Sequence, residues 1–142
     1  MNAVVDTNVI AYYLLGTEPF VDEARRFWRT VGQPQAPAVW AAELANVVWM
    51  AVRTGVLSAD EGHRRLDFAA RLHVRSVSAR ILWQGALARA IGADVPVYDT
   101  LFVKLAVRER LPLVTFDTKL LDAFPGMGTA PGVLCAVESA VR

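Results

Sequence analysis

Short apolar runs alternate with longer stretches of helical spacing along this chain, and that alternation limits its fold more than any other feature. Residues 3–5 and 111–116 are predicted to be buried strands, and further strands are expected at 36–38, 73–77 and 133–136. Short apolar strands separated by helices are typical of a parallel sheet that is covered on both faces. The sequence therefore predicts an α/β fold.

The stretches between these strands carry signals that start and stop helices. Thr7 or Asn8 is expected to cap the first helix and Gly16 to end it, and Ser58 with Glu61 has the spacing of a capping box. No repeat or low-complexity segment interrupts the pattern, so residues 1–142 are expected to form a single domain. The predicted helices cover residues 9–15, 17–31, 39–53, 58–72, 78–92, 97–110 and 119–123, and a loop is expected at 125–132.

Composition narrows the class of protein. The 142 residues are 54% apolar and 20% charged, which fits a folded domain with a buried core and excludes a disordered chain. No apolar run is long enough to span a membrane, and the N-terminus lacks a basic region followed by an apolar core, so we expect a cytoplasmic protein. The single cysteine, Cys135, cannot form an internal disulfide, which fits a reducing compartment.

Four acidic side chains lie in apolar surroundings in this sequence. Asp6 and Asp117 each follow a predicted strand directly, which places them at the carboxyl edge of a parallel sheet, where α/β proteins bind ligands. Glu43 and Asp99 interrupt the apolar faces of two predicted helices, where a charged group is seldom buried without a partner. An acid after a strand is often only a helix cap, and for Asp6 or Asp117 alone that interpretation stays open.

If the four acids converge, their mutual repulsion requires protons or a compensating cation. Two carboxylates about 5 Å apart repel by roughly 3 kcal/mol at an effective dielectric near 20. Ligands that are all oxygen favour Mg²⁺ or Mn²⁺, whereas zinc prefers Cys and His. Cys135 stands alone in the sequence, and His63 and His73 have no carboxylate at ligand spacing. The residue types therefore indicate a magnesium or manganese site.

Four segments resemble the acidic motifs of a known family. They are VVDTN at residues 4–8, Glu43 in a mid-chain helix, YDTL at 98–101 and LVTFD at 113–117. In order and spacing these segments are similar to the motifs of the PIN-domain ribonucleases, and the nearest branch is the VapC toxins of toxin-antitoxin pairs. The resemblance covers essentially the whole chain, and its specificity comes from the ordered combination of the four motifs.

The resemblance implies a three-layer α/β/α sandwich around a central parallel sheet of four or five strands, with RNA cleavage that depends on Mg²⁺ or Mn²⁺. It also implies a homodimer and inhibition by a cognate antitoxin protein. Carried over by position, the catalytic and metal-binding acids are Asp6, Glu43, Asp99 and Asp117. Asn8 and Thr115 match the polar positions beside the first and fourth acids, and Asn46 and Asp122 are further candidates.

The mechanistic hypothesis is that these acids hold one or two metal ions that polarise a phosphodiester and activate a water, whose proton passes to Glu43 or Asp117. A net charge of +1 argues against a strongly basic DNA-coating protein, but thirteen of the fifteen cations are Arg, whose planar fork matches phosphate. A genome whose base composition favours Arg codons would explain the excess of Arg equally well. Arg residues in the helices predicted at 58–72 and 78–92 are candidate contacts to RNA phosphates, although a solvated helix face is the commoner role.

Two other functions fit parts of the pattern. A phosphatase that forms an aspartyl-phosphate would carry a second acid two residues after the strand-end Asp6, but that position is Asn8. The alternative from a different class is a catalytically inactive binding module of the same fold. The presence of all four acids argues against the binding module, and RNA cleavage that requires Asp6 and Asp99 would distinguish it from the enzyme.

Overall fold

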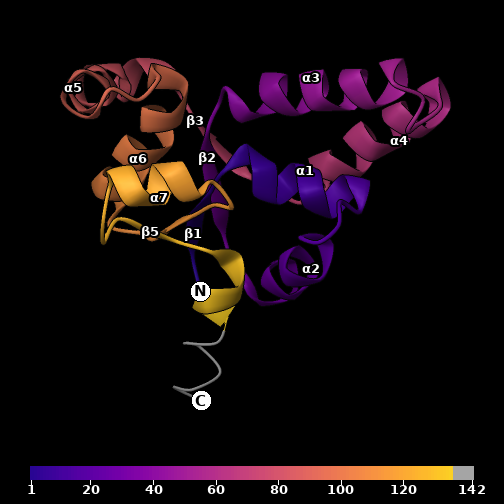
Figure 1. Cartoon of the computed structure of the whole chain (residues 1–142), viewed down its shortest axis with the longest axis horizontal. Coiled ribbons are helices and arrows are strands. Elements are labelled where there is room, and N and C mark those ends of the chain that lie inside the picture. The colour runs from indigo at the N-terminus through magenta and orange to yellow at the C-terminus, as the bar shows by residue number, and fades with distance from the viewer. Residues whose placement is uncertain (136–142) are drawn as a thin grey trace.

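Residues 1–135 are described by the computed structural model, and within them five parallel strands form one sheet (Figure 1). The order across the sheet is β3-β2-β1-β4-β5. This arrangement confirms the predicted parallel α/β fold. The strands are β1 (Ala3–Val5), β2 (Pro34–Pro37), β3 (Arg75–Val77), β4 (Leu113–Val114) and β5 (Gly128–Thr129).

Helices cover both faces of this sheet, which makes the three expected layers. Figure 1 shows α1, α2, α3 and α4 on one side of the strands and α5, α6 and α7 on the other. None of the described helices is both long and apolar enough to cross a membrane. The helices are α1 (Thr7–Leu15), α2 (Val21–Thr30), α3 (Trp40–Arg53), α4 (Ala59–Ala70), α5 (Trp83–Ala93), α6 (Val97–Glu109) and α7 (Thr118–Ala123), with a 3₁₀ turn, η1, at Ala79–Ile81.

The core lies between the sheet and these two helical layers. Val4 and Val5 of β1 are completely buried, and so are Phe27 of α2 and Ile10 of α1; Phe102 of α6 is 1% exposed. Burying each such side chain stabilises the folded chain by roughly 1.5–3 kcal/mol. Because β1 contributes only buried residues, it must lie in the middle of the sheet, as it does.

The order of the strands creates a crevice beside β1. After β1 the chain adds β2 and β3 on one side, and it later crosses to place β4 and β5 on the other side. The helices that follow β1 and β4, which are α1 and α7, lie on opposite sides of the sheet (Figure 1). In open parallel sheets such a reversal of strand order opens a ligand-binding crevice at the carboxyl ends of the strands.

The predicted last strand at 133–136 is wrong. Residues 131–135 are helical, and residue 136 lies outside the described part of the chain. The edge strand is instead Gly128–Thr129, inside the predicted loop, where the Leu113 N–H donates to the Met127 carbonyl at 3.2 Å. A Cβ at residue 128 would lie 2.9 Å from the Leu113 carbonyl oxygen, so the glycine that suggested a loop is what permits the close strand pairing.

Several boundaries also differ from the prediction. In the range predicted as a strand, 111–116, only Leu113–Val114 forms a β-strand. The helix expected at 78–92 is divided into η1 and α5, because the buried Leu82 has a φ of −110° and the Ser78 hydroxyl accepts a bond from the Arg80 N–H. The predicted capping box at Ser58 and Glu61 is confirmed by two reciprocal hydrogen bonds of 3.0 and 3.1 Å.

Candidate active site

Asp6 is held at the point where β1 ends. Its backbone N–H donates to the Val114 carbonyl of β4 at 2.9 Å, and its side chain is only 9% exposed. Asp6 occupies the N-cap position of α1, but its carboxylate does not cap that helix. Instead, Oδ2 accepts hydrogen bonds from the Thr115 hydroxyl at 2.7 Å and from the Asn8 amide at 3.4 Å.

Asn8 and Thr115 connect the end of β1 to the turn that follows β4. The Asn8 amide nitrogen donates to Thr115 Oγ1 at 3.2 Å, and its amide oxygen accepts from the Phe116 N–H at 3.2 Å. Thr115 Oγ1 also accepts from the Asp117 N–H at 2.9 Å. The fully buried Thr115 hydroxyl thus uses its one donor and both of its acceptor positions. These bonds fix Asp6 and Asp117 relative to each other.

Asp117 does cap a helix. Its Oδ1 accepts from the Leu120 N–H of α7 at 3.1 Å, so the capping interpretation holds for this acid. Capping uses only one of the two carboxylate oxygens. Asp117 also lines a cavity of about 200 Å³ together with Asp99, and the same cavity contains Asp94 and Lys119. The cap and a role in the crevice are therefore compatible.

Glu43 and Asp99 approach the crevice from the first turns of α3 and α6. The prediction that Thr7 or Asn8 caps α1 is wrong, because both residues lie inside that helix. The Thr7 hydroxyl instead donates a hydrogen bond of 2.8 Å to Glu43 Oε1 and so positions this carboxylate. The face of α3 around Glu43 is less buried than expected, because Met50 is 42% exposed. Within residues 1–135, no Lys or Arg forms an ion pair with any of the four acids.

The four acids influence one another electrostatically. Burial raises the pKa of Asp6 to about 6, and the charges of Asp99 and Glu43 add to that effect, while its hydrogen bond from Thr115 opposes it. Burial also raises the pKa of Glu43, with a further contribution from Asp99. The pKa of Asp99 is raised first by burial and then by the charge of Asp117. Asp99 therefore interacts with each of the other three.

This donor set fits a hard divalent cation. The four groups are all carboxylates, they disfavour one another's charge, and no cationic side chain in the described chain is paired with them. No three acidic, His or Cys side chains among residues 1–135 are close enough to form a closed ligand cage. Mg²⁺ is usually bound by only one or two carboxylates and keeps several waters, so an open set of this kind suits it.

The structure does not bring every candidate into the network. Asn46 and Asp122 are exposed, and neither forms a hydrogen bond with the four acids among the described residues. Sequence reasoning missed the roles of two residues. Thr7 was predicted only as a cap, although its place directly after a strand-end acid was a usable signal. Lys119 follows Asp117 by two residues, and nothing in its local pattern marked it as part of a cavity.

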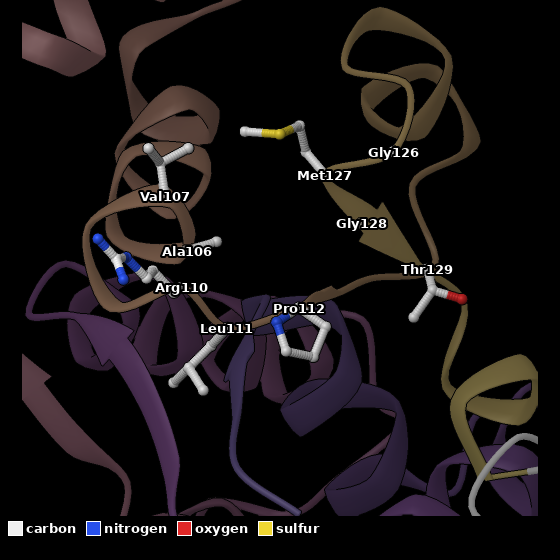
Figure 2. Close-up of a pocket in the computed structure, with 9 residues that line it drawn as sticks. All are labelled: Ala106, Val107, Arg110, Leu111, Pro112, Gly126, Met127, Gly128 and Thr129. Atoms are coloured by element: carbon white, nitrogen blue, oxygen red, sulfur yellow. The ribbon is translucent and has the colours of Figure 1, made fainter.

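Another cavity lies away from the four acids. It measures about 480 Å³ and lies at the start of β4, at the opposite end of that strand from Asp117. Figure 2 shows its walls coming from the end of α6, from Leu111 and Pro112, and from residues 126–129, with the Met127 side chain directed toward α6. No acidic residue lines it. This cavity therefore lies at the other end of β4 from the four acids.

Comparison with known proteins agrees with this geometry. A family model described as PIN domain matches residues 3–124. The chain is 33% identical over 133 residues to Ribonuclease VapC3 of Pyrobaculum aerophilum, an alignment that covers 91% of this chain and 99% of that protein.

Two solved structures share the fold. A toxin-antitoxin complex from Klebsiella pneumoniae matches with a TM-score of 0.63 at 20% identity, covering 91% of this chain and 97% of the other. VapBC2 from Rickettsia felis, bound to a DNA fragment from its promoter, matches with a TM-score of 0.62 at 14% identity, covering 90% and 96%. At these identities the two structures establish the fold alone.

Proposed function

This chain belongs to the PIN-domain family, and from that membership we propose that it is a metal-dependent endoribonuclease and the toxin of a toxin-antitoxin pair. The name of its relative, Ribonuclease VapC3, supports the activity. The observation that carries the proposal is the gathering of acids at the switch point of the sheet, where Asp99 interacts electrostatically with Asp6, Glu43 and Asp117.

In this proposal Asp6 and Asp99 bind a Mg²⁺ or Mn²⁺ ion, and Glu43 and Asp117 complete its surroundings. When bound, such an ion polarises the scissile phosphodiester and lowers the pKa of an attacking water. The chain's own contribution is to hold these carboxylates in place. Thr115 fixes Asp6 Oδ2 at 2.7 Å, and Thr7 fixes Glu43 Oε1 at 2.8 Å. Such preorganisation means that the carboxylates need not rearrange during the reaction.

The activity is tested by incubating the purified protein with RNA in the presence of Mn²⁺, Mg²⁺ or a chelator. Cleavage by the wild type should require a metal, and Asp6→Asn and Asp99→Asn should each reduce it by about 100-fold or more. Asp122→Asn is the matched control, because Asp122 is exposed and outside the network. This variant should cut at the wild-type rate. If the folded wild type cuts no RNA with Mn²⁺, the chain is instead an inactive binding module.

A cognate antitoxin is the proposed protein partner. One structural neighbour is by title a toxin-antitoxin complex, which supports a partner of that kind for this chain. The test is to co-express the chain with the product of its neighbouring reading frame. Co-purification and loss of the RNA cleavage are expected. An RNA substrate and such a partner would both place the protein in the cytoplasm.

A homodimer is the proposed assembly. Trp83, Leu87 and Ile91 form a stripe on α5 at intervals of four residues, and all three are exposed. Tyr98, at the start of α6, is 64% exposed. Exposed apolar surface on this scale is typical of an interaction site, and a second copy of the chain is the occupant that the family resemblance implies.

A further inference from the structure

A second polar cavity lies between α1, α2 and α4, and we call it the arginine pocket. It has a volume of about 450 Å³ and shares no lining residue with the cavity around Asp99 and Asp117. Its defining side chains are four arginines and two aromatic rings: Arg25, Arg64, Arg65, Arg71, Tyr13 and Phe68. The proposed cleavage reaction uses none of these residues.

The positive charge of this pocket is largely uncompensated. Arg25 pairs with Asp22 at 3.4 Å, but no ion pair within residues 1–135 involves the other three arginines. Asp67 is the only acid in the lining, and it too forms no ion pair in the described chain. The four arginines outnumber the acids near them, Asp22 and Asp67, so the pocket keeps a net positive charge and favours an anionic ligand.

Arg65 contributes one nitrogen atom that an anionic ligand could contact. Its Nε is buried and has no hydrogen-bond partner in the part of the chain that the structure describes. A buried donor without an acceptor is destabilising, and such an atom is rarely retained unless something satisfies it. A guanidinium presents its N–H groups in a planar fork that fits the oxygens of a phosphate. A phosphate at this position would satisfy the Arg65 Nε.

Two aromatic rings beside the arginines indicate that the anionic ligand is a nucleotide. The Tyr13 and Phe68 rings lie 6.1 Å apart, and Phe68 is 41% exposed. Tyr13 is itself supported by Trp28, with ring centroids 5.9 Å apart, so it is a rigid surface. Single-stranded nucleic acids are bound by stacking bases on such rings beside a basic groove that holds the phosphates. A ligand that carries only carboxylates would leave the exposed face of Phe68 unused.

We propose that the arginine pocket binds single-stranded RNA, with a phosphate on Arg65 and its neighbours and a base against Phe68. This inference rests on the proposed function, because the arginine pocket would bind the same RNA that the four acids are proposed to cleave. Tyr13 lies six residues beyond Thr7 on α1, which is about 9 Å along the helix axis. A strand held at the pocket is therefore within a few nucleotides of the acids.

RNA binding is measured by fluorescence anisotropy with a short labelled single-stranded RNA, in chelator so that it is not cut. The double variant Arg64→Glu/Arg71→Glu should weaken binding about tenfold or more and reduce the salt slope by roughly 0.7 for each phosphate that is no longer neutralised. Both residues are exposed, so their replacement should not disturb folding. Phe68→Ala should weaken binding about tenfold through the loss of stacking.

The matched control is Arg26→Glu/Arg108→Glu, which makes the same change of charge at two exposed positions outside the pocket. It should bind RNA within about twofold of the wild type. Equal losses in the two double variants would overturn the proposal, because binding would then follow net charge alone. The proposal also fails if a polyglutamate peptide displaces the RNA at lower concentrations than unlabelled RNA does, since the pocket would then suit an acidic protein segment.

Cleavage with Mn²⁺ is measured in parallel to separate this proposal from the one on which it rests. If the wild type cuts RNA but the Arg64→Glu/Arg71→Glu variant binds as the control does, only the pocket is refuted. If the wild type cuts nothing yet its RNA binding depends on Arg64 and Arg71, the proposed nuclease activity fails and the pocket remains an RNA site.

Discussion

At the scale of single residues, the feature that matters most is how each acid of the crevice is restrained. Asp6 is held by Thr115 and Glu43 by Thr7, whereas Asp99 accepts no side-chain or capping hydrogen bond within the described residues. Of these two restrained acids Asp6 is buried and Glu43 is half-buried, and burial disfavours the charged form of each. The metal-free protein therefore carries an electrostatic cost at this site that depends on pH.

Stability in chelator should fall as the pH rises from about 4 to about 6. The pKa of Asp6 is raised from 3.8 to about 6 in the folded chain, so the folded state retains a proton that the unfolded state has already released. A shift of about two units corresponds to about 3 kcal/mol, present below pH 4 and lost by about pH 6. Urea unfolding of the wild type and Asp6→Asn across this range measures it. Parallel pH profiles for the two proteins would contradict the prediction.

Asp99→Asn should unfold no earlier than the wild type in chelator. Replacement removes a charge that raises the pKa values of Asp6 and Glu43, and so relieves repulsion. With Mn²⁺ the order should reverse, because an ion stabilises only the chain that binds it. Melting temperatures with chelator and with Mn²⁺ provide the measurement, and Asp122→Asn should follow the wild type in both. A marked loss of melting temperature in chelator would mean that Asp99 has a structural role.

At the scale of elements, short strands depend on their neighbours more than on their own sequences. β4 and β5 contain two residues each, and β5 exists because Gly128 can approach the Leu113 carbonyl. β4 in turn supplies the Val114 carbonyl that anchors the Asp6 backbone. β5, which the sequence did not predict as a strand, therefore supports β4, the strand that anchors Asp6.

Gly128→Ala should destabilise the fold by about 1–3 kcal/mol. The added Cβ would lie 2.9 Å from both the Leu113 carbonyl oxygen and a Leu121 methyl group, so the edge strand must move. Gly92→Ala is the control, because that position lies inside α5 with no atom within 4 Å of the new Cβ. It should raise stability by up to about 1 kcal/mol. Chemical denaturation compares the two, and equal effects would show that the close approach at Gly128 is unimportant.

At the scale of the whole molecule, the reversal of strand order separates two kinds of surface. Figure 1 shows α1 and α3 on one side of the sheet and α6 and α7 on the other. Asp6 directly precedes α1 and Glu43 lies in α3, whereas Asp99 lies in α6 and Asp117 directly precedes α7. The outer face of α5 is left exposed and apolar. Because the two surfaces are distinct, we expect that the proposed dimerisation and the proposed RNA cleavage can be altered separately.

Ile91→Asp should convert the proposed homodimer into a monomer. Ile91 is 75% exposed at the end of the apolar stripe on α5, and a charge there would be buried without a partner in a dimer interface. The dissociation constant should rise by about 30-fold or more. Val56→Asp is the control, because Val56 is 67% exposed but lies after α3. Analytical ultracentrifugation gives the masses, and a wild type that sediments as a monomer would refute the dimer.

Much of the fold was predictable because its signals are local. The alternation of strands and helices, the capping box at Ser58 and the end of α1 at Gly16 each depend on residues near one another in sequence, and each is confirmed. The edge strand was not predictable, since Gly128 and Thr129 become a strand only by pairing with β4. The strand predicted at 133–136 was wrong because a short apolar run does not by itself distinguish a strand from a helix, and residues 131–135 are helical.

The sequence by itself determined which acids are candidates, because a carboxylate in an apolar stretch is conspicuous without any structure. Only the tertiary structure decided how these acids are related. It brought Thr7 to Glu43 and Thr115 to Asp6 across 36 and 109 residues of chain, and it made Asp117 a helix cap as well as a member of the crevice. It also gathered arginines from α2 and α4 around one cavity. Hydrogen bonds and repulsion act over a few ångströms in space, whereas a sequence records only distance along the chain.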